Sequence, residues 1–121
     1  MTVIECFGGR YVDKNLLEKI AKLEYHQRLL LEIIDHPHQQ FNKLVIECSI
    51  AEKEVEEFIN FCESMNKEWE EQKAEGFVYF QPLFQKFKNQ LHVRLQPEKV
   101  ISACIKQRIY LPLMEEFKKY L

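Results

Sequence analysis

Between Lys14 and Ile34 the apolar positions recur at alternating steps of four and three residues, a spacing typical of an amphipathic helix. We name the positions at these steps the seam, and they are Leu16, Ile20, Leu23, Gln27, Leu30 and Ile34. Further apolar residues widen the surface beside the seam, namely Leu17, Tyr25, Leu29, Leu31 and Ile33. The pattern therefore predicts a helix about 30 Å long that needs cover on more than one side.

A single small subunit has few other apolar residues with which to cover such a helix, so we expect a helix of a second molecule to cover the remaining face. The seam is then the candidate interface, and Gln27 sets the register of pairing at a cost in stability. The alternative is a central helix that its own chain covers completely.

The next segment, DHPHQQF from Asp35 to Phe41, holds two histidines and an aspartate, which are ligand types for a transition metal. No H-E-x-x-H or Cys/His spacing is present to complete a metal site. Pro37 disfavours helical geometry at His36 and suits a first helical turn. We interpret the segment as a helix junction in which Asp35 or His36 caps a short helix over about 37–48, with His36 and His38 exposed.

A second long helix is predicted after Ser49, because SIAE is a capping-box pattern. It should end near Glu75, since Gly76 suits the left-handed position after a helix. Its inner stripe is Val55, Phe58, Ile59, Cys62, Met65 and Trp69. Trp69 is therefore expected in the core.

Prolines mark the starts of three further helices, near Pro82, Pro97 and Pro112. Six helical segments with no credible sheet predict an all-α fold, a compact multi-helical array with a long N-terminal helix and a long acidic central helix. Residues 1–12 are expected to form an extended arm ended by Gly8–Gly9, and residues 13–121 a single helical domain.

The 121 residues are 46% hydrophobic and 30% charged, which fits one globular domain. The net charge of −2 is unevenly placed. Residues 52–75 hold nine glutamates against three lysines, whereas residues 80–121 hold eight lysines and arginines against three glutamates. We expect the acidic helix to lie near the basic segment, within one subunit or between two. Because the basic residues are interspersed with acids and apolar anchors, we expect no nucleic-acid partner.

No apolar run approaches the length of a membrane span, and the start of the chain is unlike a secretory signal. The four cysteines, Cys6, Cys48, Cys62 and Cys104, form no C-x-x-C pair and are expected to be reduced thiols. A cytoplasmic location without membrane contact follows as the expectation.

No catalytic triad, phosphate loop or dinucleotide fingerprint can be assembled from the sequence. We therefore predict no catalytic residues, no metal and no cofactor. The favoured function is that of a non-catalytic, homo-oligomeric interaction module. We expect a dimer or trimer, which can also bind an unidentified protein partner. The alternative is a small-ligand-binding protein or enzyme with an aromatic-lined pocket near residues 77–87.

Four stretches, KLEYHQRLLLEIID, SIAEKEVEEF, QKAEGFVYFQPLFQKF and IYLPLMEEFKKYL, resemble the YhaI-like proteins of bacilli. The clearest signatures are L-E-Y at Leu23–Tyr25, Q-K-A-x-G-F-V at Gln72–Val78 and L-M-E-x-F at Leu113–Phe117. These small proteins carry a domain of unknown function, and the resemblance implies an all-helical fold from about Lys19 to Leu121. The resemblance transfers no active-site residues to this chain, and it assigns no role to residues 1–12.

Overall fold

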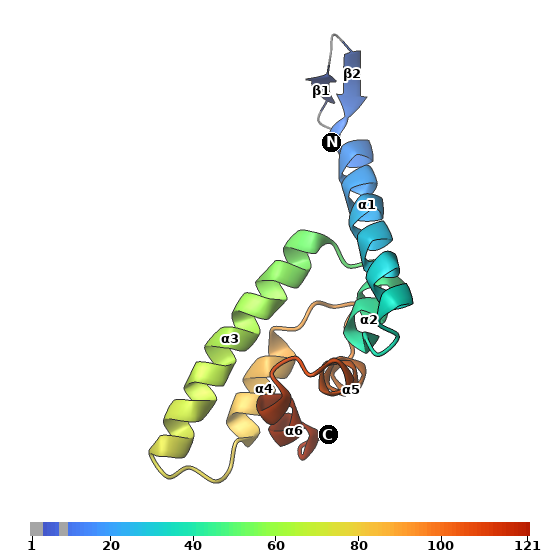
Figure 1. Ribbon diagram of the computed structural model, residues 1–121. Coiled ribbons are helices and arrows are strands. Elements are labelled where there is room, and N and C mark those ends of the chain that lie inside the picture. Colours follow the sequence, from blue (N-terminus) through green and yellow to red (C-terminus); the bar gives the residue numbers. More distant parts are fainter. Residues whose placement is uncertain (1–3, 8–9) are drawn as a thin grey trace.

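The chain is described by a computed structural model that covers residues 4–7 and 10–121, with side chains from residue 13 onward. Six helices follow a short hairpin in this described part (Figure 1). The elements are β1 (Ile4–Phe7), β2 (Arg10–Asp13), α1 (Lys14–Asp35), α2 (Gln40–Glu47), α3 (Glu52–Ala74), α4 (Gln81–Asn89), α5 (Pro97–Gln107) and α6 (Leu111–Lys118). The predicted all-α fold is confirmed for the domain that follows the hairpin.

A short hairpin lies where an extended arm is expected. Strands β1 and β2 pair antiparallel, with Ile4 opposite Asp13. The expectation of no sheet was therefore wrong for this short segment, because a four-residue strand carries too little alternation to be recognised in sequence. The expected turn at Gly8–Gly9 lies outside the described residues.

Helix α1 begins and ends close to the predicted residues. Asp13 is the N-cap, and its side chain accepts a hydrogen bond of 2.7 Å from the backbone N–H of Asn15. At the other end the N–H of His36 bonds to the carbonyl of Glu32, and Pro37 follows. The cap and the proline together set the length of the helix at 22 residues.

Helix α2 begins at Gln40, three residues later than expected. The backbone N–H of Gln39 bonds to the carbonyl of His36, and that of Gln40 bonds to the carbonyl of His38, so the proline lies in a turn rather than in the first helical turn. The N-cap is Gln39 and its side chain makes no capping bond, which corrects the capping role expected of Asp35 or His36. The junction is otherwise as predicted, with both histidines exposed.

The start of α3 also differs from the prediction. Ser49 is not the cap, because it adopts a left-handed backbone with φ of 55° that lets Ile50 enter the core. Ala51 is the N-cap residue, and the Glu54 carboxylate accepts a 3.0 Å hydrogen bond from its N–H. Burial of Ile50 thus moves the helix start two residues beyond the expected cap.

The end of α3 confirms the role predicted for Gly76, which has a φ of 96°. The N–H of Gly76 bonds to the carbonyl of Lys73, and the N–H of Phe77 bonds to the carbonyl of Gln72. These two bonds form a Schellman motif, which satisfies carbonyls that the helix leaves open.

The core lies between α3 and the last three helices. Phe87 of α4 and Phe117 of α6 are fully buried, and their ring centroids lie 4.9 Å apart. Toward α2, Phe58 of α3 stacks on Phe41 at 5.2 Å. The predicted stripe of α3 is confirmed in its main members, which are the buried side chains Phe58, Cys62, Met65 and Trp69.

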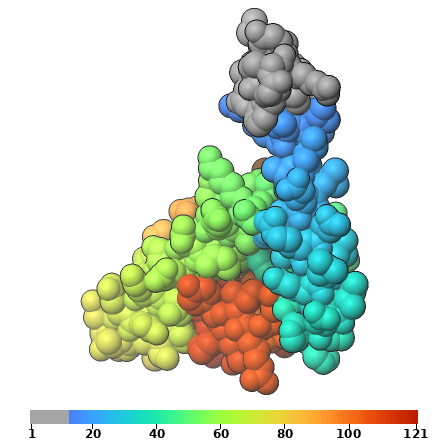
Figure 2. All heavy atoms as spheres, turned by 45° about the horizontal axis from the view of Figure 1, so that its top comes forward, coloured from blue at the N-terminus to red at the C-terminus, as the bar shows by residue number. Residues whose placement is uncertain are grey.

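Helix α1 stands apart from this core. Its C-terminal half lies beside α2, whereas its N-terminal half rises clear of the other helices and leads to the hairpin (Figure 1). In the space-filling view the same half forms a narrow neck above the body (Figure 2). Most of the surface of α1 therefore has no cover within the described part of the chain.

Candidate functional site

The inner face of α1 is attached to the turn that connects α2 with α3. His26 and Leu29 are the two buried residues of the helix. The Nε2 atom of His26 lies 2.7 Å from the carbonyl oxygen of Ile50, and since a carbonyl oxygen only accepts, the Nε2–H group donates to it. This bond ties α1 to the residue whose burial sets the start of α3.

Two exposed contacts extend the same attachment. The guanidinium of Arg28 donates to the carboxylate of Glu52 at 2.7 Å, and the ammonium of Lys22 donates to the hydroxyl of Ser49 at 3.5 Å. Exposed pairs of this kind contribute little stability each. They show that the inner face of α1 already has a partner in its own chain.

The seam lies on another face, and its apolar members are exposed. The exposed fractions are 50% for Leu16, 42% for Ile20, 66% for Leu23, 49% for Leu30 and 74% for Ile34. Gln27 is exposed between them, and Leu31 beside them is 61% exposed. From residue 16 to residue 34 the seam thus presents to solvent an apolar surface that is interrupted at Gln27.

Two opposite charges flank the seam. Lys19 precedes Ile20, Glu24 follows Leu23, and both side chains are exposed. Neither forms an ion pair with another side chain that the structure describes. Both are therefore free to meet charges on a second molecule.

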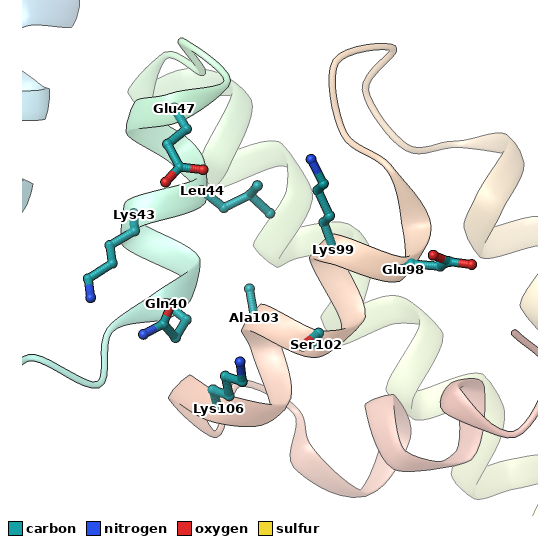
Figure 3. Close-up of a pocket in the computed structure, with 9 residues that line it drawn as sticks. All are labelled: Gln40, Lys43, Leu44, Glu47, Glu98, Lys99, Ser102, Ala103 and Lys106. Atoms are coloured by element: carbon teal, nitrogen blue, oxygen red, sulfur yellow. The ribbon is translucent and has the colours of Figure 1, made fainter.

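A polar hollow of about 280 Å³ lies between α2 and α5 (Figure 3). Leu44 and Ala103 face each other across it, and the polar side chains around them are Gln40, Lys43, Glu47, Glu98, Lys99, Ser102 and Lys106. Three lysines and two glutamates stand around the rim, mostly exposed. Such mixed, solvated charges are typical of an ordinary helix–helix groove.

A more enclosed pocket of about 350 Å³ lies between α2 and α3 and is lined by Phe41, Phe58 and Phe61. Glu54 and His92 stand at it, with Nε2 of His92 in contact with Oε2 of Glu54. Because Nδ1 of His92 accepts a 3.1 Å bond from the N–H of Arg94, Nε2 carries the proton toward Glu54. This pocket combines an aromatic wall with one polar pair.

The aromatic residues of 77–87, where an aromatic-lined pocket was the alternative expectation, are divided between the surface and the core. Phe77 and Tyr79 are exposed, while Phe80, Phe84 and Phe87 pack into the core. The stretch contributes only Phe84 to a hollow of about 350 Å³, beside Tyr120 and Leu121. Sequence reasoning missed the pocket at Phe41, because its residues come from three separate segments.

The candidate metal ligands do not converge. His36 and His38 are exposed at the junction, and no group of three or more His, Cys, Asp or Glu side chains suited to a metal occurs among the described residues. Burial raises the pKa of the Cys104 thiol to about 12, and burial together with the nearby Cys104 raises the pKa of Cys62 well above its usual range. Both thiols therefore stay protonated and unreactive at neutral pH.

Two further findings bear on the class of protein. No helix within the described ranges combines the length and the apolar character needed to cross a membrane. The family model described as protein of unknown function, DUF1878, matches residues 13–121, which is nearly the whole chain and leaves out the hairpin up to Val12.

Proposed function

The chain belongs to the DUF1878 family of proteins of unknown function, and we propose that it works by protein contact, as a homo-oligomer held together along α1. The interface is the seam, Leu16, Ile20, Leu23, Gln27, Leu30 and Ile34. The oligomer is a dimer or trimer, and residues 13–121 act as its single helical domain.

The observation that carries this proposal is the exposure of the seam. Complete burial of a leucine or isoleucine contributes about 1.5–3 kcal/mol relative to exposure. The five apolar seam residues are 42–74% exposed, so a partner could contribute roughly half of that amount at each position. Apolar surfaces of this extent on a soluble chain usually mark an interface.

A second copy is the partner that best fits this surface. In a closed symmetric oligomer every subunit buries the same face at once, so no subunit keeps an exposed seam. The face spans nearly all of a 22-residue helix, about 33 Å long. The inner face stays attached to its own chain through His26, so pairing requires no refolding.

We place this assembly in the cytoplasm, without cofactor, metal, membrane or nucleic acid. The free thiols of Cys48, Cys62 and Cys104 suit a reducing compartment. The kinship with the YhaI-like proteins of bacilli, and an additional unidentified protein partner, are part of the same proposal.

The direct test replaces Leu23 and Leu30 by Glu. Leu23 is 66% and Leu30 49% exposed in the single chain, so the folded subunit tolerates the change, whereas the interface would bury four carboxylates per dimer. We expect helical circular dichroism to persist while light scattering reports one-chain mass. The matched control is Val93→Glu, at a residue that is 95% exposed and lies outside the seam. If the Leu23→Glu/Leu30→Glu variant keeps the mass of the wild-type oligomer, the seam is not the interface.

A second candidate function rests on the pocket beside Phe41. Its aromatic wall and the Glu54–His92 pair could bind a small ligand with an apolar body and a polar end. Screening a fragment library by amide chemical shifts tests this alternative. Shifts that cluster at residues around His92 would support it, and shifts scattered over the chain would argue against it.

A further inference from the structure

We infer that two copies of this chain pair through α1 in parallel and in register, as a short two-stranded coiled coil. This inference rests on the proposed function and adds the number, direction and alignment of the helices. It is argued from the residue types along the seam, from the two charged residues that flank the seam, and from the exposure of these residues to solvent.

The first step is the order of residue types along the seam. Steps of four and three assign Leu16, Leu23 and Leu30 to the d positions of a heptad repeat, and Ile20, Gln27 and Ile34 to the a positions. Isoleucine at a with leucine at d favours two parallel strands, whereas isoleucine at d favours larger assemblies. All five apolar positions of the seam obey the two-stranded rule.

The second step concerns Gln27. In a parallel pair Gln27 faces Gln27 of the other copy, and the two amides can hydrogen-bond to each other in the layer. In an antiparallel pair centred on the seam, each Gln27 faces Leu23 of the other copy, so two amides are buried against leucine. A polar residue at a single a position is a known means of fixing register and strand number.

The third step is charge complementarity. Lys19 holds the g position before Ile20, and Glu24 holds the e position five residues later. Parallel coiled coils bring each g residue beside the e residue five positions ahead on the other helix, so two Lys19–Glu24 pairs form between copies. The antiparallel alignment would instead place Glu24 against Glu24, and like charges in contact oppose association.

The fourth step is access. His26, Leu29 and the half-buried Tyr25 hold the inner face of α1 against its own subunit. The seam is exposed along the length of the helix, from Leu16 to Ile34, so a second α1 can lie against it. The two subunit bodies would then stand on opposite sides of the paired helices.

Cysteine cross-linking tests the direction. The background carries Cys6→Ser and Cys48→Ser, which leaves the buried Cys62 and Cys104 as the native thiols. In this background Ile34→Cys places two thiols in one layer of a parallel pair, and mild oxidation should give a covalent dimer. In an antiparallel pair the two residues 34 lie about 27 Å apart, far beyond the reach of a disulfide.

Two controls make the result specific. Ala21→Cys, exposed on the same helix but off the seam, should give no dimer under the same oxidation. The double variant Leu16→Cys/Ile34→Cys can cross-link in either direction, through like residues in a parallel pair and through residues 16 and 34 in an antiparallel pair. It is therefore compared with the single variants Leu16→Cys and Ile34→Cys. Dimer from the double variant with none from either single variant would overturn the inference.

Charge variants test the register independently of disulfide chemistry. Lys19→Glu converts both ion pairs to repulsions and should weaken self-association about three- to tenfold at low salt. Lys19→Glu/Glu24→Lys exchanges the charges and should restore it. Equal dissociation constants for wild type and Lys19→Glu would contradict the parallel register.

The failures of the two proposals are distinguishable. A monomeric wild type removes the proposed function and this inference together. A wild-type dimer without Ile34→Cys cross-linking overturns the parallel direction alone, and a wild-type mass of three chains overturns the two-stranded assignment while the homo-oligomer stands.

Discussion

Helices α1 and α3 are nearly equal in length, at 22 and 23 residues, and both repeat apolar side chains every three or four positions. The apolar face is buried in α3 and exposed in α1. In α3 the stripe from Phe58 to Trp69 is buried, and Cys62 and Met65 are at most 1% exposed. In α1 the seam is exposed, up to 74% at Ile34. The same sequence signal thus produces a core helix in one place and an open face in the other.

The difference comes from what lies beside each helix. Helix α4 runs back along α3, and the rings of Phe61 and Phe87 stack across the two at 6.1 Å (Figure 1). Within the described part of the chain, helix α1 meets α2, the turn at Ile50 and the first residue of α3, Glu52, and these contacts leave the seam open. Hydrophobic periodicity predicts that a face will be buried, and the chain's path decides whether its own residues bury it.

The largest expected effect tests whether the apolar stripe of α3 lies in the core. Trp69→Ala should lower the free energy of unfolding by about 3–5 kcal/mol, because it removes a buried ring that contacts Phe80 edge to face at 6.3 Å. Urea denaturation followed by circular dichroism measures the change. Trp69→Phe should cost less, since the indole N–H has no hydrogen-bond partner among the described groups. A loss within about 0.5 kcal/mol for Trp69→Ala would mean that α3 is not the core helix.

The next effect tests the inner face of α1. His26→Ala removes a buried donor and leaves the carbonyl of Ile50 without its partner, so unfolding should become about 1–3 kcal/mol easier. The control is Glu18→Ala, an exposed change on the same helix, which should stay within about 0.5 kcal/mol. Equal stability of the two variants would show that α1 is not held by its inner face.

The smallest effect concerns the junction after α1. Replacing His36 and His38 by Ala should leave the melting temperature unchanged, with or without added zinc, because both side chains are exposed. Differential scanning calorimetry gives the comparison. A zinc-dependent rise in the wild type that the double variant loses would reveal a metal site at the junction.

The helices and most of their ends could be predicted from local signals. Pro82, Pro97 and Pro112 each lie in the first turn of a helix, and Gly76 closes α3 as expected. Two other turns could not be predicted, because Ser49 in one and Arg108 and Tyr110 in the other adopt left-handed backbones without glycine. At Ser49 the left-handed backbone accompanies the burial of the next residue, Ile50, and no local residue preference announces any of the three conformations.

The residues that make up the candidate interface could be predicted from the sequence, but their exposure to solvent could not. The seam can be read from residues 16 to 34 alone, yet its openness depends on where α2 and α3 go after the junction. The aromatic pocket was not predictable, because Phe41, Phe58 and His92 are far apart in sequence and meet only in the folded chain. Long-range contacts of this kind leave no periodic signal.

The central claim is that the open face of α1 is covered by another copy of the chain. Sedimentation equilibrium of the wild-type protein at micromolar concentration tests it most directly. We predict a mass two or three times the 14.6 kDa of one chain, and the residue types of the seam favour two copies. A mass of 14.6 kDa that stays constant over about a hundredfold range of concentration would contradict it, and α1 would then be a helix with a permanently exposed apolar face.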